Sequence, residues 1–104
     1  GAAAAFVQAA AERVAQPIPG RKPSAEALQR PMLVLRLAGD LGLWGSAAFP
    51  SLAHSVTSAV LCCGGSHAHD VREVARLYAH AAQPFTVALA LALVSRVEAV
   101  GGEL

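Results

Sequence analysis

The residues best suited to chemistry lie together in the segment CCGGSHAHD, at residues 62–70. Its metal-binding residue types are Cys62, Cys63, His67, His69 and Asp70. Thiolate and imidazole are the ligands that zinc prefers, but paired zinc ligands usually stand about two to four residues apart on a rigid turn, and adjacent cysteines fit that spacing poorly. We therefore expect the cysteines to be small apolar residues that close a helix and the histidines to lie in a solvated turn. The prediction is no bound metal and no cofactor, with zinc as the alternative.

No arrangement of a nucleophile and a base indicates an enzyme. Serine, histidine and aspartate are present, but no GxSxG motif surrounds a serine. His54 precedes Ser58 by four residues, which permits a hydrogen bond on one helix face but makes no catalytic triad. The segment GDLGLWG, at residues 39–45, follows a helix-like run rather than a strand, so it matches neither a phosphate loop nor a dinucleotide fingerprint. The sequence predicts that the chain is not an enzyme.

Composition limits the classes of partner. A chain of 104 residues has room for one domain with one modest core. Hydrophobic residues make up 55% and charged residues 14%, below the usual share of about a quarter. Such a chain is expected to hide apolar surface in a partner or a membrane. The net charge is +1 without a basic block, so no nucleic-acid partner is predicted. The two neighbouring cysteines are no disulfide framework and favour a reducing compartment.

The most apolar stretch is PFTVALALALVSRVEAV, at residues 84–100. Its leucines alternate with alanines, which is the period of a strand, but alanine is a strong helix former and a poor strand residue. Pro84 suits the first position of a helix, and the glycine pair after Val100 suits the position just past its end. We predict a helix that is apolar on every face, that is the most buried helix of the fold, and in which Leu91 belongs to the core.

The rest of the chain shows four further amphipathic segments separated by glycine and proline. Residues 2–15 form an alanine-rich stripe, and a stripe near residues 52–63 contains Leu52, Val56, Ala59, Val60 and Cys63. Asp70 and Glu73 make a start like a capping box, after which Val71, Val74, Tyr78 and Ala82 are expected to point inward. The prediction is an all-α fold, a small bundle of about five short helices around the C-terminal apolar helix.

Prolines and a glycine divide the chain near its beginning. Residues 16–23, QPIPGRKP, are predicted to be an extended linker without regular structure. The predicted organisation is an N-terminal helix at residues 1–15, this linker, and a four-helix core at residues 24–104, with the first helix separable from the core.

One helix face is the best candidate for binding. Val34, Leu37, Leu41 and Trp44 share a face at a spacing near seven for two turns, and Leu33 and Leu35 widen the stripe. This spacing suits a helix laid in a groove, and tryptophan is a common interface anchor, although Trp44 is equally compatible with an ordinary core. We predict a helical interaction or scaffold module that docks on a larger protein or assembly.

The alternative function is a small membrane-embedded subunit of a multi-subunit complex, with an organellar complex as one option. Residues 77–95 contain no formally charged side chain, and their length is close to the roughly 20 residues of a spanning helix. Polar residues and Pro84 interrupt the first half, so the segment resembles a core helix more than a span. Membrane embedding is therefore the less favoured interpretation.

Overall fold

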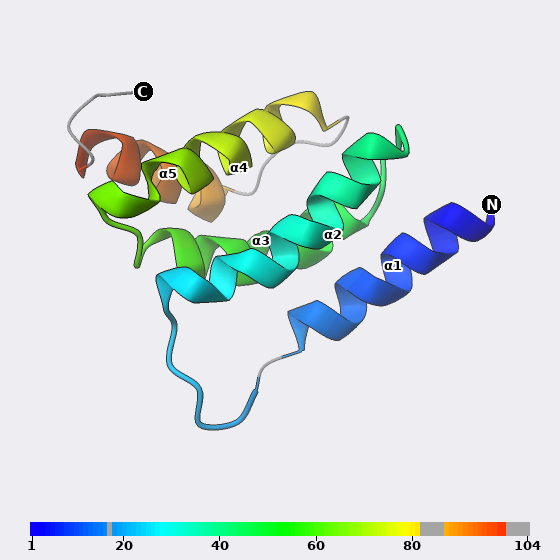
Figure 1. Cartoon of the computed structure of the whole chain (residues 1–104), viewed down its shortest axis with the longest axis horizontal. Coiled ribbons are helices and arrows are strands. Elements are labelled where there is room, and N and C mark those ends of the chain that lie inside the picture. Colours follow the sequence, from blue (N-terminus) through cyan, green and yellow to red (C-terminus); the bar gives the residue numbers. More distant parts are fainter. Residues whose placement is uncertain (17, 82–86, 100–104) are drawn as a thin grey trace.

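The computed structural model describes residues 1–16, 18–81 and 87–99, with only the backbone of residues 87 and 97–99. In this part of the chain every regular element is a helix (Figure 1). The α-helices are α1 (Ala2–Ala15), α2 (Gln29–Asp40), α3 (Ala48–Val60), α4 (Ala68–His80) and α5 (Val87–Ala99), and the short 3-10 helices are η1 (Ala25–Leu28) and η2 (Gly65–His67). The predicted all-α bundle of about five short helices is confirmed.

Helix α3 occupies the centre of the bundle. It packs against α1, α2, α5 and η1, so neighbours surround most of its circumference. Its buried side chains are Ala48, Phe49, Leu52, Ala53, Val56, Ala59 and Val60. The hydroxyl of Thr57 on this helix is hydrogen-bonded, because its Oγ1 donates to the carbonyl oxygen of Ala53 at 2.7 Å. The stripe that the sequence predicted for residues 52–63 is therefore the middle of the core.

Helix α5 lies at the edge of the bundle, on α3 and α4. Leu89 and Leu93 point into the core, whereas Leu91 is 65% exposed and Val94 is also exposed. The prediction that the C-terminal helix is the most buried one, with Leu91 in the core, is wrong for the described residues. The physical reason is its position: a peripheral helix buries only the side that meets its neighbours, however apolar the other side is. Pro84 and Val100, the predicted ends, lie outside the described residues.

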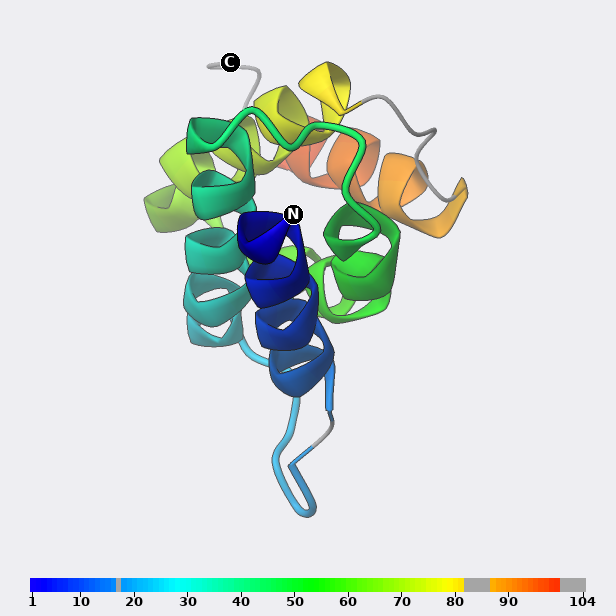
Figure 2. The same ribbon diagram turned by 90° about the vertical axis from the view of Figure 1, so that its right-hand side faces the viewer.

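Helix α1 is part of the same core. It packs against α2 and α3, and Figure 2 shows it lying in front of the bundle with these two helices on either side. Val7 and Ala11 are fully buried there. Because deleting residues 1–15 would uncover this contact, the predicted separability of the first helix has no support in the packing.

The linker lacks regular structure over residues 18–24 and projects as a loop beyond the helices (Figure 2). A turn is closed by the backbone N–H of Arg21, which donates to the carbonyl oxygen of Ile18 at 3.1 Å. Gly20 occupies this turn with φ +79°, a conformation that side chains with a Cβ rarely adopt. The first residue after α1, Gln16, is already extended, and Pro17 lies outside the described residues.

Candidate docking surface

Helix α2 presents two apolar faces. The inner face belongs to the core and contains Met32, Leu35 and Ala38, all essentially without exposed area. The outer face contains Leu33, which is 63% exposed, and Leu37, which is half-buried against the core, and it continues to Leu41, the residue after the helix end, which is 47% exposed. Side chains four residues apart lie on the same side of a helix, so Leu33, Leu37 and Leu41 follow one another along the surface. We call these three leucines the outer stripe.

The four predicted binding residues do not share one exposed face. Val34 is buried in the core, and Trp44 is half-buried against it. Leu37 and Leu41 lie on the outer stripe. Leu33, which the sequence suggested only as a widening of the face, is the most exposed leucine of α2. The signal that could have placed it was its spacing of four residues from Leu37, repeated between Leu37 and Leu41.

Trp44 reaches the core because the chain reverses sharply after α2. The backbone N–H of Leu43 donates to the carbonyl oxygen of Ala38 at 2.7 Å, and that of Gly42 donates to Gly39 at 3.0 Å. Gly42 has φ +71°, so these bonds form a Schellman motif with glycine in the left-handed position. The segment GDLGLWG is therefore a helix end and a turn, which agrees with its position after a helix-like run.

The indole of Trp44 packs on α2, α3 and α4. Its ring centroid lies 5.9 Å from that of Phe49 and 5.4 Å from that of His80. A Cβ on Gly39 would stand 2.7 Å from the indole Cη2, so the absent side chain of Gly39 makes room for the ring. Through these contacts Trp44 holds the turn after α2 against the core.

An ion pair fixes α2 to α4. The Arg36 Nε donates to Glu73 Oε2 at 3.0 Å, and Nη2 donates to Oε1, so the guanidinium holds the carboxylate with two nitrogens. This hydrogen bonding holds the pKa of Glu73 below its ordinary value. Both side chains are partly exposed. Arg36 stands next to Leu37 in sequence, and its pairing with Glu73 limits the rotation of α2 about its axis.

The cysteine and histidine segment does not form a metal site in the structure. Cys63 is buried and its thiol donates to the carbonyl oxygen of Ala59 at 3.4 Å, whereas Cys62 is exposed. Burial raises the pKa of the Cys63 thiol, which disfavours the thiolate that a metal requires. Within residues 1–16, 18–81 and 87–99, no group of three or more His, Cys, Asp or Glu side chains is placed to hold a metal ion.

Helix length bears on the alternative function. Among the helices of the described residues, none combines the length and the apolar character that crossing a membrane requires.

Comparisons with known proteins give no relative. No protein-family model, no curated protein and no solved structure matches this chain.

Proposed function

We propose that this protein is a helical interaction module that docks on a larger protein or assembly through the outer stripe of α2. The observation that carries the proposal is the succession of exposed Leu33, half-buried Leu37 and exposed Leu41 along one side of α2 and its terminal turn. Single exposed leucines are normal on protein surfaces and need no explanation. Leucines at intervals of four residues, two exposed and a half-buried one between them, match the anchor pattern of a helix that lies in an apolar groove.

Composition supports the same proposal. Hydrophobic residues make up 55% of the chain and charged residues 14%, so the surface is poor in the charges that keep a small free domain soluble. Other large side chains are exposed as well: Phe6, Ile18, Leu61, Leu91 and Val94. A partner that covers part of this surface would gain hydrophobic stabilisation without requiring a change in the fold.

The proposed contact differs from the face suggested by sequence. Leu33, Leu37 and Leu41 make the contact, while Val34 and Trp44 hold the helix and its terminal turn from the inside. In this proposal the chain has no catalytic role, and its specificity comes from the shape of the partner's groove.

A site-specific crosslink tests the proposal and identifies the partner. A photoreactive residue is placed at Leu41, which is 47% exposed, and in a matched control at Leu61, which is 51% exposed in the turn after α3. Each tagged chain is expressed in cells of its natural source, irradiated and analysed by mass spectrometry. We expect a discrete protein adduct from position 41 and none of that mass from position 61.

Two results would overturn the docking proposal. Absence of an adduct from position 41, or the same adducts from both positions, would mean that the outer stripe is not a specific interface. Lipid adducts from position 41, together with a requirement for detergent to extract the chain at high salt, would favour the membrane-embedded subunit instead.

A further inference from the structure

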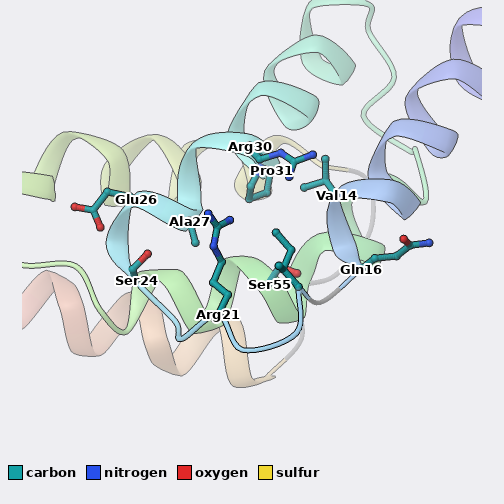
Figure 3. A pocket seen from close by; sticks show the side chains of 10 residues that line it. Val14, Gln16, Arg21, Ser24, Glu26, Ala27, Arg30, Pro31 and Ser55 are labelled. Atoms are coloured by element: carbon teal, nitrogen blue, oxygen red, sulfur yellow. The ribbon is translucent and has the colours of Figure 1, made fainter.

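A hollow of about 330 Å³ lies beneath the linker, where the end of α1, the start of α2 and the middle of α3 meet (Figure 3). Its walls include Val14 from α1, Arg21 and Ser24 from the linker, Arg30 from α2 and Ser55 from α3. This volume is at the lower end of the range for small-molecule sites. Four separate segments of the chain therefore supply side chains to one space.

Two arginines give the hollow its charge. Arg21 extends from the linker and Arg30 from the first turn of α2, on two sides of the same space (Figure 3). Neither guanidinium has a hydrogen-bond or ion-pair partner in the part of the chain that the structure describes, in contrast to Arg36, which is held by Glu73. Glu26 lines the edge, but its carboxylate points away from the space between the arginines (Figure 3).

Uncharged donors complete the polar wall. The hydroxyl of Ser24 makes no capping bond to η1, although Ser24 stands at its N-cap position. Ser55 from α3 lines the same hollow, whereas the side-chain amide of Gln16 points away from it (Figure 3). Guanidinium groups bind phosphate oxygens through paired N–H donors, and hydroxyl groups donate to the remaining oxygens.

The other walls are apolar. Val14, Ile18 and Pro31 line the hollow beside the arginines. A second hollow of about 280 Å³ shares Arg21 and adds Lys22, which increases the positive charge beside residues 18–23. An anion that also carries a small organic part would use both kinds of wall, which an inorganic ion cannot.

We propose that this hollow binds a small phosphorylated organic molecule, whose phosphate group is held by Arg21 and Arg30 with Ser24 and Ser55, and whose organic part lies against Val14, Ile18 and Pro31. The site is separate from the outer stripe of α2, so the proposal does not depend on the docking function. The ligand would join the linker to α2 and α3, because Arg21, Arg30 and Ser55 come from these three segments.

Titration of the full chain followed by amide chemical shifts tests the site. The probes are glycerol 3-phosphate, inorganic phosphate and glycerol. We expect saturable shifts with glycerol 3-phosphate in residues 18–31 and at Ser55, weaker binding of inorganic phosphate, and no binding of glycerol. Arg21→Gln and, separately, Arg30→Gln should each weaken glycerol 3-phosphate binding about tenfold or more. The matched control Arg72→Gln removes an exposed arginine on α4 and should leave the affinity unchanged.

Each contrary result has a defined meaning. No saturable shift with glycerol 3-phosphate, or equal losses in Arg21→Gln and Arg72→Gln, would overturn the site. Equal affinity for glycerol 3-phosphate and inorganic phosphate would overturn the organic part of the ligand. Thermal melts of the variants show that they are folded, and because Arg21 is exposed on the linker its replacement should not alter the melting temperature.

Discussion

Leu33 and Leu35 are the same residue type on the same helix, yet they have opposite surroundings. Leu35 has no exposed area, and Leu33 is 63% exposed. Two residues correspond to about 200° of rotation around a helix, so the two side chains leave α2 on opposite sides. The inner side contributes to the free energy of folding, whereas an exposed side chain such as that of Leu33 contributes little to it. In the docking proposal, Leu33 and Leu41 gain their contacts from the partner instead.

The largest expected loss of stability comes from a substitution on the inner face of α2. Leu35→Ala should lower the free energy of unfolding by about 2–5 kcal/mol, because it removes buried methyl groups and leaves a cavity. Leu33→Ala should change it by less than about 0.5 kcal/mol, since the side chain is mostly in water already. Urea denaturation of both variants measures the difference. Similar losses for the two variants would mean that the faces of α2 are not distinct in the way described.

A smaller effect is expected from the polar contact inside the bundle. The hydroxyl of Tyr78 on α4 donates to the carbonyl oxygen of Phe49 at 2.6 Å, in a buried position. Tyr78→Phe removes the donor and leaves a buried carbonyl with one partner fewer, which should cost about 1–2 kcal/mol. Urea denaturation measures this cost, and an unchanged free energy of unfolding would show that the hydrogen bond contributes nothing.

Tyr78 also predicts how stability responds to alkali. Burial raises its pKa above the ordinary value, because the charged phenolate is poorly solvated in the core. A raised pKa in the folded state gives stability that is complete below the unfolded pKa of about 10 and is lost as the pH rises above it. Tyr78 is the only tyrosine in the chain. Ultraviolet absorbance should therefore show tyrosinate only as the protein unfolds, and ionisation of the folded protein at the ordinary pKa would contradict this account.

The ion pair at the border between the two faces should have a still smaller effect. Glu73→Gln leaves Arg36 without its partner and should cost less than about 1 kcal/mol at neutral pH, because both side chains are partly in water. The pKa of Glu73 is lowered in the folded state, so its contribution is present above the unfolded pKa of about 4.3 and is lost as the pH falls through the folded value. Stability measured against pH should show a smaller acid dependence in Glu73→Gln, and an identical profile would contradict the pairing.

Periodicity in the sequence was sufficient for the elements and for most inward faces. Val71, Val74 and Tyr78 point inward on α4, and the stripe from Leu52 to Cys63 is buried, as predicted, while Ala82 lies outside the described residues. In these two helices polar residues occupy the face opposite the apolar stripe, so the spacing of the apolar residues predicts only one buried face. Helix α2 has leucines on both sides, and the same spacing rule then permits two stripes, of which the structure exposes the one containing Leu33.

The periodicity of the sequence could not predict how deeply each helix is buried in the fold. Residues 84–100 are the more apolar segment, yet α3 is the central helix and Leu91 of α5 faces water. Burial depends on how many neighbours surround a helix, and this is decided by the path of the whole chain rather than by the helix itself. The hollow beneath the linker was equally hidden, since Arg21, Arg30 and Ser55 come together only in the folded chain.

The most direct test of the docking surface measures the affinity of the crosslinked partner for the wild-type chain and for two variants, Leu33→Asp and Leu91→Asp. Leu33→Asp places a charge on the outer stripe of α2, and Leu91→Asp places the same charge at a side chain of nearly equal exposure on α5. The account predicts that Leu33→Asp weakens binding about tenfold or more while its melting temperature stays near that of the wild type, and that Leu91→Asp binds like the wild type. Wild-type affinity in a folded Leu33→Asp variant would contradict the claim that the outer stripe is the docking surface.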